Sequence, residues 1–156
     1  MNLKSVFLEL AEALNNDTDI AAFMQETYGE STIGRINIGI DSEEYPDVNE
    51  TTAIYMLPGS RSRTRGDAYR QHNISIICLV NVNTVNSESG ISENNIDKIE
   101  ALGTLDDFTN LVEKCVFEKL QSLKLAITPL SGESDELYYP IACSELAYSV
   151  EIPSRI

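Results

Sequence analysis

The sequence predicts an α+β fold in which a mixed or antiparallel sheet carries two main helices on one face, in the order α–β–β–β–α–β–β. Two observations lead to this prediction. The spacing of apolar residues changes from a helical period to strict alternation near residue 35, and one long helical pattern separates the first three strands from the last two. A length of 156 residues suits one hydrophobic core, so we expect a single domain over residues 1–156.

The first thirty residues predict two helices. The first helix follows from apolar residues at helical spacing, namely Leu3, Phe7, Leu10 and Leu14. Asp17 or Thr18 can cap a second, shorter helix, because both side chains accept hydrogen bonds from free backbone N–H groups. Gly29 is the expected end of that helix, since glycine adopts the left-handed conformation of a C-terminal cap at little cost.

Three strands are expected next. Isoleucine alternates with polar residues over 35–41, which indicates a strand with one wet face. A second strand covers 51–57, and the pair Pro58-Gly59 predicts a turn that ends it. In the third strand, at 73–82, both alternating rows are apolar, so we expect it to be central and covered on both sides.

The second half of the chain predicts one long helix and two more strands. Residues 83–103 are polar and read as an unusually long loop, with a short helical turn in its second half. A broad apolar stripe predicts a helix over 105–123, with Thr104 as its cap. Strands are expected at 125–130 and 141–152, joined by an acidic loop.

The amino-acid composition excludes or disfavours several classes of function. The formal charge of −14 opposes general binding to nucleic acid and permits pairing with a basic protein surface. No apolar run approaches the ~20 residues needed to cross a bilayer, and the amphipathic N-terminal pattern is unlike a signal peptide, so we expect a cytosolic origin and no membrane partner. Three widely spaced cysteines in apolar stretches predict small buried hydrophobes rather than disulfides or a zinc site.

The sequence offers no recognisable catalytic constellation. His72 is the only histidine, so no histidine pair can hold a metal, and we interpret it as a polar residue at the start of the central strand. No nucleotide-binding, nucleophile-elbow or zinc-protease motif is present. We therefore expect no enzyme activity, no metal and no cofactor. Paired carboxylates of an unrecognised enzyme site stay open as an alternative, because an acidic chain offers many pairs.

The uneven placement of basic charge is the strongest functional clue. Four of the eleven basic side chains, Arg61, Arg63, Arg65 and Arg70, fall within ten residues. In an extended backbone the first three point to the same side. Lying between strands that end near Leu57 and begin near Arg70, they predict a long hairpin arm whose guanidinium groups engage carboxylates or phosphates. A solvated loop that offsets the acidic body is the alternative. The charge balance favours an acidic protein surface as the partner.

The order of elements, the size and the charged hairpin together resemble phage tail terminator (tail completion) proteins. These are small α+β proteins that form a ring ending the tail tube and joining it to the head. The likeness is one of topology and pattern and covers most of the chain, with the exception of the polar stretch at 83–103. It is carried by the helix at 3–14, the strands at 35–41, 51–57 and 70–82, the helix at 105–123 and the last strand.

This resemblance implies a structural virion protein made in the cytoplasm of a host bacterium, without enzymatic activity. It implies a homohexameric ring with the tail tube protein on one side and head-connector proteins on the other. DNA would then be only passing cargo, and an acidic lumen would let it slide. A head–tail adaptor or closure protein of the same neck, and a bacterial adaptor with an acidic partner, are the alternatives.

Overall fold

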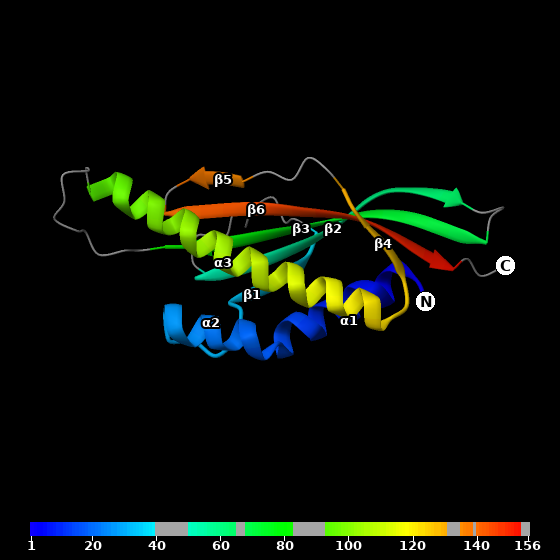
Figure 1. Cartoon of the computed structure of the whole chain (residues 1–156), viewed down its shortest axis with the longest axis horizontal. Coiled ribbons are helices and arrows are strands. Elements are labelled where there is room, and N and C mark those ends of the chain that lie inside the picture. Colours follow the sequence, from blue (N-terminus) through cyan, green and yellow to red (C-terminus); the bar gives the residue numbers. More distant parts are fainter. Residues whose placement is uncertain (40–49, 65–67, 83–92, 131–134, 139, 154–156) are drawn as a thin grey trace.

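The computed structural model describes residues 1–39, 50–64, 68–82, 93–130, 135–138 and 140–153. These residues form three helices and a six-stranded mixed sheet. The helices lie together on one side of the sheet (Figure 1), and their apolar side chains share one core with the sheet. The predicted α+β class is confirmed, as is the packing of the helices on one face.

The two N-terminal helices form where the sequence predicts them. Helix α1 spans Leu3–Asn16, and the Asn2 side chain caps it by accepting from the Ser5 N–H at 2.9 Å. Helix α2 spans Thr18–Tyr28. Asp17 is its cap, accepting from the Ile20 N–H at 2.9 Å. Gly29 ends α2 in the left-handed conformation, with φ of 70°.

The sheet has the order β1-β2-β3-β6-β4, with β5 also paired to β6. Only the β1–β2 contact among the described strands is parallel. The central strand is β3, as predicted, and it pairs with β6 along its whole length. The strands are β1 (Arg35–Ile38), β2 (Thr52–Thr64), β3 (Tyr69–Asn81), β4 (Ala126–Pro129), β5 (Asp135–Tyr138) and β6 (Ile141–Pro153).

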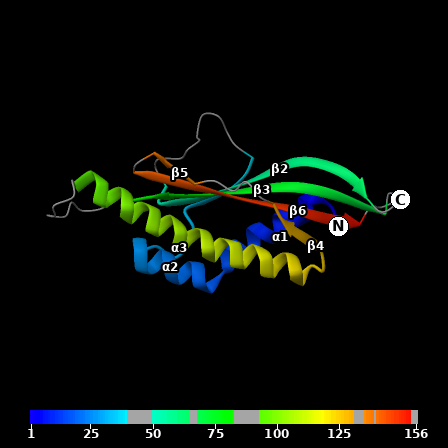
Figure 2. The same cartoon turned by 45° about the horizontal axis from the view of Figure 1, so that its top comes forward.

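Helix α3 begins earlier than the sequence predicts. It spans Glu93–Ser122, so Thr104 lies inside the helix and is not its cap. The sequence predicts only a short helical turn in this stretch, but 93–103 is helical throughout and continuous with the rest of α3, whereas 83–92 lies outside the described residues. Figure 2 shows the N-terminal part of α3 running out past α2. Ile99 is 60% exposed there, which explains why no apolar stripe marks this end.

Two further expectations need correction. The acidic loop expected between the last strands includes a strand, β5, which pairs with the start of β6. In β1, Ile38 is 57% exposed although its alternation predicts the buried face. β1 is a short strand at the end of the sheet order, paired to β2, so less of the core reaches it.

Buried apolar residues lie on both faces of part of the sheet. Ile74, Ile76 and Cys78 of β3 face the helices and belong to the main core with α1 and α3. Leu79 belongs to a smaller cluster on the opposite face, with Tyr55 of β2. The prediction that the third strand is covered on both sides is thus confirmed around Leu79, whereas Ser75 and Ile77 on the same face are only partly buried.

Candidate functional site

The long hairpin formed by β2 and β3 extends beyond the layer of helices. Figures 1 and 2 show its free end projecting past α1, at the end of the molecule that also holds the N- and C-termini. The prediction that Pro58-Gly59 ends the second strand is wrong, because β2 continues to Thr64 and stays paired with β3 up to Tyr69. The arginine segment is therefore largely strand rather than a loop-like arm.

A β-bulge explains how the strand passes this turn-like pair. Pro58 pairs with Ile74 and Arg61 pairs with His72, so β2 advances three residues while β3 advances two. One residue is thus inserted, as in other bulges. Gly59 fits the crowded position, since a Cβ atom added to it would lie 2.8 Å from the Asn73 carbonyl oxygen.

The bulge decides which face of the hairpin is basic. Residues directly opposite each other in an antiparallel pair point to the same face. Arg61 lies opposite His72, and Arg63 lies opposite Arg70, so the four side chains share one face. We call Arg61, Arg63, Arg70 and His72 the basic strip.

The basic strip continues the core-facing row of the sheet. His72 and Arg70 have the same parity along β3 as Ile74 and Ile76, which face the helices. The row is therefore apolar under the helices and basic where the hairpin passes beyond them. A hairpin that projects without helices to cover it can carry charge on this face without burying it.

Like charges lie close together in the basic strip. Two like charges, Arg63 and Arg70, lie directly opposite each other, an arrangement that destabilises a sheet. Among the described residues, no ion pair joins Arg61 or Arg70 to a carboxylate. Burial, together with the charges of Arg61 and Arg70, lowers the pKa of His72. Arg61 and Arg70 thus offer guanidinium groups to which an acidic group can bind.

The opposite face of the same hairpin is held by neutral contacts. The Asn73 side-chain amide donates to the Ser60 hydroxyl at 2.8 Å. The Ser62 hydroxyl donates to the Gln71 side chain at 3.5 Å, and the Gln71 amide donates in turn to the Ser149 hydroxyl on β6. These contacts fix the hairpin, so the basic face is presented by a supported framework rather than by a free loop.

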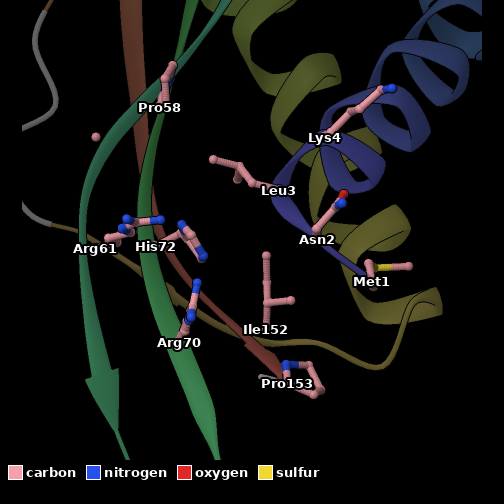
Figure 3. Close-up of a pocket in the computed structure, with 11 residues that line it drawn as sticks. Met1, Asn2, Leu3, Lys4, Pro58, Arg61, Arg70, His72, Ile152 and Pro153 are labelled. Carbon is pink, nitrogen blue, oxygen red and sulfur yellow. The ribbon is translucent and has the colours of Figure 1, made fainter. Parts of the chain in front are cut away.

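A groove of about 550 Å³ opens beside the strip, between the hairpin and the start of α1. Figure 3 shows Leu3 pointing from α1 toward the strands and Ile152 of β6 near Arg70, while the Lys4 side chain points away from the arginines. The groove thus pairs a basic wall with an apolar floor. The described residues that line it include no carboxylate and are Met1, Asn2, Leu3, Lys4, Pro58, Gly59, Arg61, Arg70, His72, Ile152 and Pro153.

The structure brings together most of the residues that the sequence singled out. Arg61 and Arg63 share a face, as their alternation predicts, and Arg70 joins them through the β2–β3 register. Arg65 lies outside the described residues. His72 was interpreted as a plain strand-end residue, yet it completes the basic strip. The missed signal is its even spacing from Arg70 along the strand.

Comparison of the sequence with models of known protein families and with curated proteins finds no match. In the described part of the chain, no helix is long and apolar enough to cross a membrane. Within the same residues, no three His, Cys, Asp or Glu side chains are grouped so that they could hold a metal ion. The site is therefore defined by its own geometry, which is that of an exposed basic surface suited to carboxylates or other anions.

Proposed function

We propose that this chain is a structural protein of virus assembly of the tail terminator type, which forms a homohexameric ring at the end of a tail tube. The observation that supports the proposal is the supported basic hairpin that projects from a strongly acidic chain. A projecting surface with charge opposite to the rest of the molecule is suited to bind a further copy or a neighbouring protein.

The groove beside the hairpin supports a binding role more than an enzymatic one. An enzyme built on paired carboxylates needs them converging in a cavity. The 550 Å³ groove instead offers guanidinium groups and apolar side chains. In the proposed ring, the tail tube protein and the head-connector proteins are the outer partners, and DNA passes through the lumen without being held.

The proposal is tested by the oligomeric state of the protein, alone and in the presence of tail tubes. We expect particle images of the purified protein, or of the protein bound to isolated tail tubes of its own virus, to contain six-fold rings. Where tubes are present, rings bound to them are expected only at the tube ends, because a terminator stops further growth of the tube. A protein that forms no ring at any concentration and does not bind tube ends contradicts the proposal.

A terminator and a head–tail adaptor give different results in the same experiment. The terminator binds tubes that lack heads, whereas an adaptor binds heads that lack tails. The mixed samples are separated on a density gradient, and the fraction that holds the protein identifies its partner.

A further inference from the structure

A groove between α2 and α3 has a charge opposite to that of the basic strip. Its volume is about 480 Å³, and its rim carries three exposed carboxylates, Asp19, Glu26 and Asp107. Phe23 and Leu111 supply its apolar lining. We call this surface the α2–α3 groove.

Packing beneath the α2–α3 groove fixes its shape. The Phe23 ring stacks on the Phe108 ring of α3 with a centroid distance of 5.6 Å. The Phe23 and Tyr28 rings form an edge-to-face pair with a centroid distance of 6.4 Å. The carboxylates stand on two helices joined by this aromatic contact. A surface held by regular elements changes little on binding.

Only part of the negative charge is offset within the chain. The Lys114 ammonium lies 3.5 Å from the Asp19 carboxylate, but both side chains are 60% exposed. Such an exposed pair is weak and exchanges readily for another partner. Glu26 and Asp107 take part in no ion pair with the other described residues.

The spacing of the two surfaces is compatible. Arg61 and Arg63 are two residues apart on a strand, or about 7 Å. Asp19 and Glu26 are seven residues apart on α2, or about 10 Å along the helix. Long arginine side chains cover that difference, and each can bind a carboxylate through two parallel hydrogen bonds.

The two surfaces cannot meet within one molecule. Figure 1 places α2 and the free end of the β2–β3 hairpin in opposite halves of the molecule along its long axis. Contact between them therefore requires two copies, with the strip of one facing the groove of the next. An interface between two different surfaces of the same chain repeats from copy to copy and closes into a ring when the rotation allows.

We infer that the basic strip of one copy docks in the α2–α3 groove of the next copy. This inference rests on the proposed function, because it names the contact that joins neighbours in the proposed ring. The occupant of the strip is thus a second copy of this chain, bound through Asp19, Glu26 and Asp107. Phe23 and Leu111 offer apolar surface at the centre of the contact.

A charge-reversal pair tests the inference. The strip variant carries Arg61→Glu and Arg63→Glu, and the groove variant carries Glu26→Lys and Asp107→Lys. Each variant alone opposes like charges at every contact, so we expect association at least about tenfold weaker than that of the unaltered protein. An equimolar mixture restores opposite charges at every contact when the copies alternate, and a ring of six accommodates this alternation.

The measurement is sedimentation velocity over a concentration series at low salt, with circular dichroism to verify folding. Matched controls make the same change in net charge elsewhere. Lys98→Glu with Lys124→Glu is the control for the strip variant, and Glu12→Lys with Glu118→Lys is the control for the groove variant. We expect both controls to associate like the unaltered protein. Failure of the mixture to recover association overturns the inference.

Cysteine cross-linking detects the contact even when association is too weak for sedimentation. Ala22→Cys in the groove and Ala68→Cys at the hairpin end are placed in separate chains, which are mixed and oxidised. Because Cys78, Cys115 and Cys143 are buried, the added thiols are the reactive ones. We expect a heterodimer of the two chains by mass spectrometry, and none when Glu12→Cys replaces Ala22→Cys. Absence of this heterodimer overturns the inference whatever the sedimentation result.

The failure of this inference is distinguishable from failure of the proposed function. Rings that persist in the strip variant leave the proposed function standing and refute the docking mode. A strip variant that self-associates normally but loses binding to tail tubes assigns the strip to a foreign acidic protein. A strip variant whose only change is lost binding to duplex DNA assigns it to nucleic acid. Each of these outcomes excludes the second copy as the occupant of the strip.

Discussion

The bulge that places the basic strip makes a sharp prediction at Gly59. Replacing Gly59 with alanine adds a Cβ atom 2.8 Å from the Asn73 carbonyl oxygen and 3.4 Å from the Asn73 carbonyl carbon. Real Cβ contacts with backbone are longer, so one strand must move away from the other. Because the nearest atom is backbone in the centre of the sheet, no side-chain rotation relieves the contact.

The expected cost follows from this forced movement. Overpacking in a well-packed region destabilises a protein by about 1–3 kcal/mol. For a chain of this size, 1 kcal/mol corresponds to a change in melting temperature of about 2–4 °C. Gly59→Ala should therefore lower the melting temperature by roughly 2–12 °C.

Gly103 provides a matched control with the opposite sign. It lies inside α3, is exposed, and has no atom within 4 Å of an added Cβ. Gly103→Ala removes backbone freedom from the unfolded chain and should stabilise the protein by about 0.5–1 kcal/mol. Both variants are compared with the unaltered protein by urea unfolding, followed by far-ultraviolet circular dichroism.

The comparison has a clear refuting result. If Gly59→Ala is as stable as the unaltered protein while Gly103→Ala gains stability, the close approach at the bulge is not a constraint. A loss of stability in both variants would instead show that the positions of Gly103 in α3 and Gly59 in β2 respond to something other than backbone freedom and space.

Two further predictions concern titratable groups. Burial and the neighbouring Arg61 and Arg70 lower the pKa of His72, so the folded state disfavours the charged imidazole. The stability that the neutral imidazole contributes is fully present above about pH 6.5, the pKa of an unperturbed histidine, and is lost as the pH falls through the lowered pKa of the folded state. The stability difference between the unaltered protein and His72→Gln should thus shift against the unaltered protein between pH 7 and pH 5, and a difference that stays constant contradicts this reasoning. Burial raises the pKa of the Cys78 and Cys115 thiols to about 12, so in the native protein their reaction with a disulfide reagent should be at least about a hundredfold slower than in urea. A fast stoichiometric phase in the native protein, measured by absorbance, would show that one of these thiols is accessible.

Much of the fold could be predicted because its signals are local. The caps at Asp17 and Gly29 act through hydrogen bonds to their own helices, and the alternation of β3 and β6 reflects burial within each strand. Such signals need no knowledge of the remainder of the chain. The buried cysteines follow in the same way, since each lies in an apolar run.

The errors arise where distant segments decide the outcome. Pro58-Gly59 has the composition of a turn, yet β3 offers a partner strand that continues past it, and the pair becomes a bulge. Near the start of α3, Ile99 and Leu102 are exposed and Gly103 resembles a helix end, so only a short helical turn is predicted there instead of the first turns of a long helix.

Prediction of the candidate site is limited in the same way, because its residues come from segments distant in the sequence. Alternation alone groups Arg61 with Arg63, because both lie on one strand. The addition of Arg70 and His72 depends on the register between β2 and β3, which one inserted residue determines. No pattern within either strand contains that information.

The continuity of β3 also has a mechanical consequence. The strand runs unbroken from the core to the hairpin end and pairs with β6 from Tyr69 to Asn81. Hydrogen bonds of an antiparallel ladder lie perpendicular to the strands, so a pull along the hairpin loads many of them at once in shear. A force applied at the arginines is thereby transmitted to the core. We expect high resistance when the chain is pulled along β3 in single-molecule force measurements, and rupture at low force would show that the hairpin yields separately.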